Sequence, residues 1–416
     1  MKTMWSGGGG TDGQRVELDS ADPLAGAIEQ AWESIAAGVS VVLGNLERDG
    51  WRRYPELSYM TGGYRLVDDY TIDREGYFQW IGFLAGRLWL LAGATGRGEF
   101  GECAQRLATM VTPSLVRPGQ VNADIGFDIY HGLCLGAEAT GDSALRDNAV
   151  AATRSMSDLY MRGSRTFAQM LPHRATVIDT GAMLTSYLWA ARVDGRLADL
   201  AYQHFLAVAE YGFIRADGTT AQRIEFGEDG STLGSPHTVQ GIDDSTTWSR
   251  GQAWGILGFV NAYECFGEAA FAEVADSLIA TMLDRMGGAP VPRYDLDASS
   301  NDSAPLDTCS AAILASVLLR WSRMRDRPEL ERRGREILLE LLTNHLSPGG
   351  VLLHGSWGRA RRRFPLGRFP QEDVMPYGNY WVCEAMYRAS QADWALLELG
   401  SSPAPAQATN DRSFDV

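Results

Sequence analysis

Three residue patterns are missing from the chain, and each absence excludes a class of protein. The five cysteines and six histidines among 416 residues form no CxxC or HxxxH pair, so a zinc site would need distant ligands, and we predict neither metal nor cofactor. No window approaches the run of about 18 apolar residues that a transmembrane helix needs, so no membrane contact is expected. The odd number of widely spaced cysteines in apolar contexts predicts buried, reduced thiols, as in a cytoplasmic protein.

Positive charge is also scarce. The formal net charge is -15 and the isoelectric point is near 4.9. Nucleic acids are bound through clustered lysine and arginine, so we do not expect a nucleic-acid partner, and an acidic substrate would need a local cationic pocket. Residues 1–16 contain a four-glycine run but no apolar segment of the kind found in secretory signals.

The composition is that of an ordinary globular protein. Hydrophobic residues make up 45% of the chain and charged residues 21%, which is enough apolar material for a large core. We predict one catalytic domain over 21–400, between an extended or disordered N-terminal arm over 1–20 and a polar, flexible tail over 401–416.

Hydrophobic periodicity predicts an all-α protein. Glycines at 96, 141, 195 and 267 separate helices that follow one another closely, whereas longer connections such as 162–179 and 213–247 separate the pairs. Six helical hairpins with the more apolar helix inside predict an (α/α)6 barrel, a six-hairpin toroid, with an open solenoid as the alternative. The predicted helices span 24–47, 76–95, 99–113, 125–140, 143–161, 180–194, 196–212, 248–266, 268–286, 307–325, 328–346 and 379–397.

Aspartates stand at or just before the predicted inner helices. Asp124, Asp179, Asp243, Asp244 and Asp307 could each be a helix cap, and capping is our main interpretation for the last three. Asp124 and Asp179 each precede a mostly apolar inner helix. If both lie at the same mouth of the barrel, their charges couple and one pKa rises, which gives a proton donor near neutral pH.

The segment TTWSRGQAW contains candidates for sugar binding. Arg250 is suited to bind a substrate carboxylate, and Trp248 and Trp254 are either stacking platforms or core residues. The segments 220–245 and 287–307 are rich in Gly, Ser, Asp and aromatic residues. They are interpreted equally as the rim of a sugar site or as solvated loops.

In these segments the chain resembles the unsaturated glucuronyl hydrolases of glycoside hydrolase family 88. The likeness extends along nearly the whole chain in the right order, and its most specific block is 237–259, whereas DIGF alone is weak. The matching blocks are GFLAGRLWLLAGATG (82–96), DIGF (124–127), VIDT (177–180), HTVQGIDDSTTWSRGQAWGILGF (237–259), PRYDLDASSNDSAPLDTCSAAILAS (292–316) and PYGNYWVCEAMYR (376–388).

The resemblance implies a reaction of polysaccharide degradation. Such enzymes remove a 4,5-unsaturated glucuronic acid from the non-reducing end of oligosaccharides that polysaccharide lyases release. One aspartate protonates the ring alkene and activates the water that adds to the far carbon, after which the hemiketal opens and expels the aglycone. Because the vinyl ether is hydrated, the spacing rules for carboxylates in ordinary glycosidases do not apply.

By matching position, the resemblance implies that Asp179 is the general acid/base and Asp124 its partner. The residues expected to contact substrate are Gln240, Arg250, Trp254, Trp248, His237 and Trp80. The chain departs from the family pattern where Ala123 and Gln222 replace common histidines and where a GFWPG-like segment reads GFLAG. These changes concern the choice of substrate and linkage more than the reaction.

Other functions remain as alternatives. An unsaturated rhamnogalacturonyl hydrolase would share the reaction, and another (α/α)6 sugar enzyme such as an epimerase would favour catalytic histidines. A non-catalytic glycan-binding toroid would retain Arg250 and the tryptophans but tolerate the loss of Asp179. The sequence indicates neither the source polysaccharide and its sulfation nor the oligomeric state.

Overall fold

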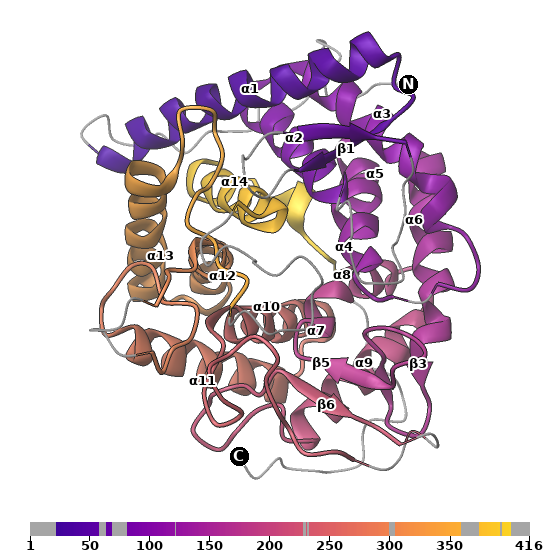
Figure 1. Ribbon diagram of the computed structural model, residues 1–416, viewed down its shortest axis with the longest axis vertical. Helices are drawn as coiled ribbons and strands as arrows, with labels where there is room; N and C mark the ends of the chain where they lie inside the picture. Colours follow the sequence, from indigo (N-terminus) through magenta and orange to yellow (C-terminus); the bar gives the residue numbers. More distant parts are fainter. Residues whose placement is uncertain are drawn as a thin grey trace.

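Helices dominate the computed structural model of the chain (Figure 1). It describes residues 22–57, 64–68, 81–120, 122–227, 230, 233–298, 304–358, 374–391 and 393–400. The predicted arm over 1–20, the tail over 401–416 and Trp80 lie outside these ranges.

Along the chain, the helical segments alternate between an inner ring and an outer ring of the barrel. The α-helices are α1 (Pro23–Asp49), α2 (Ile81–Thr95), α3 (Gly98–Leu115), α4 (Ile125–Asp128), α5 (Leu135–Thr140), α6 (Ser143–Ser155), α7 (Thr180–Met183), α8 (Thr185–Ala190), α9 (Gly195–Glu210), α10 (Ser249–Phe266), α11 (Ala269–Met286), α12 (Thr308–Arg325), α13 (Pro328–Glu340) and α14 (Pro376–Ser390). The π-helices are η1 (Ile129–Cys134) and η3 (Leu341–His345), and the 3-10 helices are η2 (Met156–Leu159) and η4 (Ala395–Leu397).

Six of these segments form a closed inner ring. In order around the ring they are α2, α4–η1–α5, α7–α8, α10, α12 and α14, and α14 packs back against α2. The outer partners, in the same order, are α3, α6, α9, α11, α13 and α1. Figure 1 shows α1, α13, α11 and α6 at the periphery and α14, α12, α10 and α2 nearer the centre. The (α/α)6 barrel is therefore confirmed, and closure between α14 and α2 excludes the open solenoid.

The inner helices are buried on all sides, which is why most of their residues are apolar. Nearly every residue of α2, α10, α12 and α14 is buried, whereas α13 buries only one stripe and exposes charged residues elsewhere. Glycines let the inner helices approach one another closely. A Cβ at Gly126 of α4 would overlap the carbonyl oxygen of Met183 of α7, and one at Gly258 of α10 would lie 3.3 Å from Gly181 of α7.

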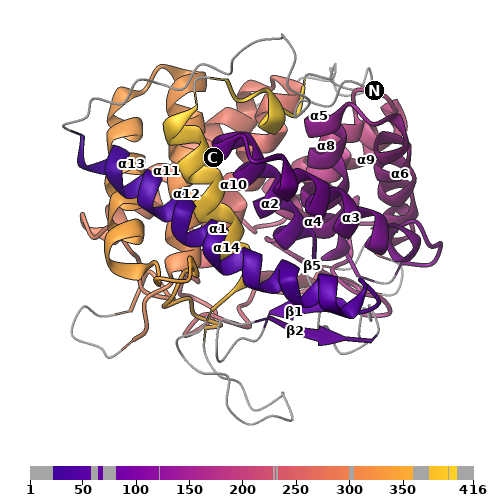
Figure 2. The same cartoon turned by 90° about the horizontal axis from the view of Figure 1, so that it is seen from above.

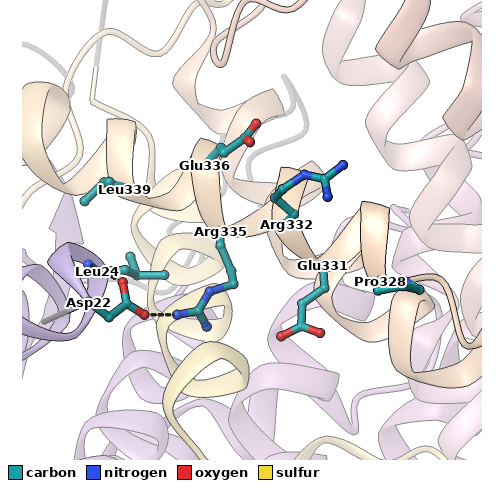
Figure 3. Close-up of a pocket in the computed structure, with 8 residues that line it drawn as sticks. All are labelled: Asp22, Leu24, Pro328, Glu331, Arg332, Arg335, Glu336 and Leu339. Atoms are coloured by element: carbon teal, nitrogen blue, oxygen red, sulfur yellow. Dashed lines mark hydrogen bonds and ion pairs between the residues drawn. The ribbon is translucent and has the colours of Figure 1, made fainter. Parts of the chain in front are cut away.

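The outer ring closes where the first helix meets α13. Asp22 caps α1 by accepting a hydrogen bond from the Leu24 N–H, and its other carboxylate oxygen pairs with Arg335 (Figure 3). Pro328 begins α13 at a first-turn position that needs no N–H. The pair of Asp22 and Arg335 therefore attaches the start of α1 to α13.

The long connections contain short antiparallel strands that periodicity does not predict. They are β1 (Tyr54–Leu57) with β2 (Tyr64–Val67), β3 (Tyr160–Met161) with β4 (Thr166–Phe167), and β5 (Ala175–Val177) with β6 (Arg223–Glu225). Figure 2 shows β1, β2 and β5 at the same end of the barrel, and Figure 1 shows β1 and β5 on opposite sides of it. Because β5 directly precedes α7, this is the end at which that inner helix begins.

Each of the twelve predicted helices has a counterpart among the described residues, with corrections inside five of them. Residues 76–80 of the helix predicted over 76–95 lie outside the described residues, and the one over 328–346 passes into the π-helix η3 at Leu341. The helix predicted over 125–140 contains the π-helix η1, the one over 180–194 breaks at Leu184 and ends at Ala190, and the one over 143–161 gives way to a 3-10 turn and β3. The last begins three residues early because Pro376 occupies its first turn, and it ends at Ser390.

Two further observations concern the chain as a whole. Within the described ranges no helix is long and apolar enough to cross a membrane. All five cysteines are free thiols, of which four are buried and Cys103 is half-buried.

Candidate active site

Asp124 and Asp179 occupy equivalent positions on neighbouring inner helices. Each is the residue directly before a short helix, α4 for Asp124 and α7 for Asp179, and the two helices touch where Gly126 meets Met183. Both carboxyl groups are therefore brought to the same region of the barrel mouth.

Neither aspartate caps its helix. A capping side chain needs an extended backbone to reach the first free N–H groups, but φ and ψ are -59° and -23° for Asp124 and -60° and -26° for Asp179, which are helical values. Neither side chain makes a capping hydrogen bond, and Oδ1 of Asp179 is buried without a partner among the described residues. Helix capping therefore does not explain these two residues.

The electrostatics of the pair follow from this placement. Burial raises the pKa of Asp124, and the carboxylates of Asp179 and Asp128 raise it further, to about 8. Burial also raises the pKa of Asp179 to about 7, although the Arg250 guanidinium and a backbone N–H oppose the rise. The Asp179 carboxylate thus contributes to the raised pKa of Asp124, and both pKa values are raised where the sequence predicted a rise in one.

Arg250 is buried near Asp179, with which it interacts electrostatically. Its Nη1 lies 2.6 Å from Oδ2 of Asp307 and donates to the carbonyl oxygen of Ser356. Its guanidinium carbon lies 4.7 Å from the ring centre of Trp248 and 5.2 Å from that of Tyr377. Burial lowers the pKa of Arg250, but Asp307 and its other neighbours outweigh this and raise it, so Arg250 remains a cation.

Aromatic rings from three inner helices, α4, α10 and α14, meet inside the barrel. Trp254 lies 5.3 Å from Phe127, 6.0 Å from Tyr377 and 6.2 Å from Trp381, measured between ring centres. The indole N–H groups of Trp248 and Trp381 are buried and have no acceptor among the described residues. The cluster therefore offers both ring faces and unused donors.

Gln240 is held by a network of amide hydrogen bonds. Nε2 of Gln222 donates to its Oε1 at 2.6 Å, and its own Nε2 donates to the carbonyl oxygen of Trp357 at 2.9 Å. Oε1 of Gln222 also accepts from the backbone N–H groups of Val239 and Gln240. Gln222, which stands where the family often has histidine, thus organises this loop. Ala123, at the other such position, is fully buried.

The remaining predicted contact residues are placed differently. His237 pairs with β6 through its backbone, and its ring Nδ1 lies 3.2 Å from Glu225 and from the carbonyl oxygen of Ser235. Its contact with substrate stays a prediction.

The two loop aspartates have local roles. Oδ1 of Asp243 accepts hydrogen bonds from the N–H and hydroxyl of Ser245, and Oδ1 of Asp244 accepts one from the N–H of Thr238. Capping is thus wrong for both, because they stabilise a loop rather than a helix end. In the part of the chain that the structure describes, no group of three His, Cys, Asp or Glu residues could hold a metal ion.

Sequence reasoning missed several residues of this site. Tyr377, Trp381 and Phe127 contribute to the aromatic cluster, and Ser356 contributes a carbonyl group to Arg250. The dense aromatic segment PYGNYW just after a helix-starting proline was the available signal for Tyr377 and Trp381. Nothing local indicates Ser356, because only its backbone is used.

Comparison with known proteins gives relatives of one kind. No family model matches the chain. It is 26% identical to the unsaturated glucuronyl hydrolase of Bacillus sp. (strain GL1), over 86% of this chain and 96% of the relative. It is 24% identical to the unsaturated chondroitin disaccharide hydrolase of Streptococcus pneumoniae, over 76% of this chain and 82% of the relative.

The solved structures agree with this result. The crystal structure of the unsaturated glucuronyl hydrolase from Bacillus sp. GL1 superposes with a TM-score of 0.76 at 23% identity, covering 88% of this chain and 98% of the other. An unsaturated glucuronyl hydrolase specific for heparin superposes with a TM-score of 0.73 at 21% identity, covering 89% and 99%. The resemblance seen in the sequence is confirmed: the curated relatives are named unsaturated glucuronyl hydrolase or unsaturated chondroitin disaccharide hydrolase, and the structural neighbours are unsaturated glucuronyl hydrolases. These enzymes are glycoside hydrolases.

Proposed function

We propose that the chain is an unsaturated glucuronyl hydrolase that removes a 4,5-unsaturated glucuronic acid from the non-reducing end of lyase-generated oligosaccharides. The observation that supports this most is the pair of Asp124 and Asp179, which do not cap their helices, have raised pKa values and stand beside the buried cation Arg250. Two carboxyl groups with pKa values near neutrality are costly to the fold, and such groups gather at catalytic sites.

In the proposed reaction Asp179 is the general acid and base. A carboxyl group with a pKa of about 7 gives up and regains its proton at neutral pH with little free-energy cost. It protonates C4 of the ring alkene and takes a proton from the water that adds at C5, which forms a hemiketal. The ring then opens, and the aglycone leaves from C1 with its oxygen.

Asp124 supports this step from the neighbouring helix. Its pKa of about 8 keeps it protonated at neutral pH, so it is a hydrogen-bond donor while Asp179 cycles between its two forms. Two adjacent carboxylates would repel each other. Because Asp124 carries a proton, this repulsion is absent, and the charged form of Asp179 is more stable.

The surrounding groups fit an acidic, unsaturated sugar. Arg250 is the cation for the uronate carboxylate, which meets the need for a local positive charge in a chain of net charge -15. Trp248 and Trp381 offer ring faces and free indole donors, and Gln240 offers an amide held by its neighbours. Relatives named for chondroitin disaccharide make glycosaminoglycan fragments the first substrates to test.

The histidines do not favour an epimerase. His131 is buried among aromatic rings, and burial lowers its pKa to about 4, while burial lowers that of His204 on the outer helix α9 to about 3. Neither is protonated at neutral pH.

The test follows the absorbance of the conjugated alkene. The chain is incubated with unsaturated disaccharides from chondroitin, hyaluronan and heparin, then with gellan, xanthan and ulvan fragments, and we expect the ultraviolet absorbance to fall with at least one of them. Asp179→Asn should lose nearly all turnover yet still bind that substrate, measured by tryptophan fluorescence. Constant absorbance with every fragment would exclude the proposed reaction. Full turnover by Asp179→Asn would exclude the assigned acid.

A further inference from the structure

Asp307 combines two roles that are usually separate. It caps α12, because its extended backbone lets Oδ1 accept hydrogen bonds from the N–H groups of Cys309 and Ser310. Its other oxygen, Oδ2, forms the ion pair with Arg250 at 2.6 Å. Both side chains of the pair are almost completely buried, with 0% exposure for Asp307 and 2% for Arg250.

The same carboxylate also holds the segment that binds Arg250 from the other side. The N–H of Ser356 donates to Oδ1 of Asp307 at 3.4 Å, while the carbonyl oxygen of Ser356 accepts from Nη1 of Arg250. The next residue, Thr308, holds this segment too, since its hydroxyl donates to the carbonyl oxygen of Leu353 at 2.7 Å. Asp307 therefore contacts α12, the segment around Ser356 and the Arg250 guanidinium at the same time.

The orientation of the Arg250 guanidinium depends on its contacts with Asp307 and Ser356. Nη1 of Arg250 is used by Asp307 and Ser356, and the rings of Trp248 and Tyr377 lie within about 5 Å of the guanidinium carbon. The rings allow the group to slide or rotate, because a ring face has no preferred direction for a donor. Among the described residues, only the contacts of Nη1 fix how the guanidinium turns. A carboxylate is recognised best by a guanidinium in a fixed orientation.

We propose that Asp307 is a positioning residue for carboxylate recognition: through its buried ion pair with Arg250 and its bond to the Ser356 segment, it fixes the guanidinium that selects an acidic sugar. This rests on the proposed function, and it gives Asp307 a task beyond capping α12.

The experiment compares two substrates for each variant. One is an unsaturated disaccharide that the chain hydrolyses, and the other is its methyl ester, which has the same alkene but no carboxylate charge. The ratio of kcat/KM for the acid to that for the ester measures how well the charge is recognised. Asp307→Asn keeps a capping oxygen but turns an amide donor toward Nη1 of Arg250, so we expect the ratio to fall by at least about 10-fold.

Two more variants separate positioning from folding. Asp142→Asn alters an aspartate that caps the outer helix α6 in the same way, through the Ala144 N–H, and should leave the ratio unchanged. Asp307→Glu retains the charge but moves it by one methylene, so the ratio should fall even if Asp307→Asn does not fold. Arg250→Gln should lower the ratio at least as much, and adding Asp307→Asn to it should lower the ratio no further.

The outcomes are distinct. If both Asp307 variants hydrolyse acid and ester in the wild-type ratio, Asp307 only caps the helix and the inference is wrong. A ratio that rises in Asp307→Asn would also overturn it, because the freed charge would then bind the carboxylate better without its partner. If the unsubstituted chain hydrolyses no unsaturated substrate, the proposed function fails, and this inference fails with it.

Discussion

Replacing Asp124 with asparagine should stabilise the fold while it impairs catalysis. The pKa of Asp124 is raised from its ordinary value of 3.8 to about 8, so the native protein binds this proton more tightly than the unfolded chain does. The free energy of unfolding therefore falls as the pH rises from about 4 to about 8. Asparagine has the same shape and no charge, and there is no capping bond to lose.

The size of the effect follows from the pKa difference. One pKa unit corresponds to about 1.4 kcal/mol, so the rise from 3.8 to about 8 gives an upper bound of ~6 kcal/mol at alkaline pH and ~4 kcal/mol at pH 7. The side chain is partly exposed at the barrel mouth, and water there offsets part of the cost. We therefore expect Asp124→Asn to raise the free energy of unfolding by ~2 kcal/mol at pH 8 and by much less at pH 4.

Urea denaturation of both proteins at pH 4, 6 and 8 measures this difference. Asp194→Asn is the matched control of opposite sign: burial raises the pKa of Asp194, but hydrogen bonds from Arg154 and the Arg196 N–H outweigh it and lower the pKa. That variant should lose stability at neutral pH, and the loss should fade as the pH falls below about 4. If Asp124→Asn were no more stable than wild type at pH 8, the cost assigned to the buried carboxyl would be wrong.

Two further predictions concern packing and acid stability. Gly126→Ala places a methyl group against the carbonyl oxygen of Met183 and should lower the free energy of unfolding by about 2 kcal/mol or more, with a loss of activity. Gly26→Ala, where α1 has open space, should raise the free energy of unfolding by about 0.5 to 1 kcal/mol. Thermal melts compare the two variants. Burial lowers the pKa of His204 to about 3, so the native state loses stability as the pH falls below about 6.5, by up to ~4 kcal/mol near pH 3. His204→Asn keeps an acceptor for the Phe167 N–H and should flatten that part of the stability curve; an unchanged curve would show that His204 does not contribute to it.

The ring of helices was predictable because its signals are local. Glycines with positive φ end helices at 96, 141 and 267, and inner helices such as α10 are mostly apolar, which a pattern of residues along the chain reveals. The strands were not predictable, because two to four residues are too few for an alternating pattern to show. The π-helix η1 was hidden for a related reason: it has the composition of the α-helix around it.

The site was predictable only in part, since it depends on contacts between distant segments. Arg250 and Trp254 belong to one specific block, and both lie at the candidate site. Tyr377 follows them by more than a hundred residues and joins them only through the closure of the ring. The ring of His237 lies beside Glu225, a pairing that the register of β6 sets and no local pattern shows.

The aspartates show most clearly where sequence reasoning ends. Asp124, Asp179 and Asp307 each stand just before an inner helix, and by residue type alone all three are equally good caps. Backbone angles separate them: φ and ψ of -127° and 88° let Asp307 reach the free N–H groups of α12, whereas the helical angles of Asp124 and Asp179 do not. A partly buried carboxyl group that satisfies no helix end costs stability, and the mouth of the barrel holds two of them on neighbouring helices. Because the carboxyl oxygens of Asp124 and Asp179 are not used as helix caps, they remain available for chemistry, and the fold is less stable as a result.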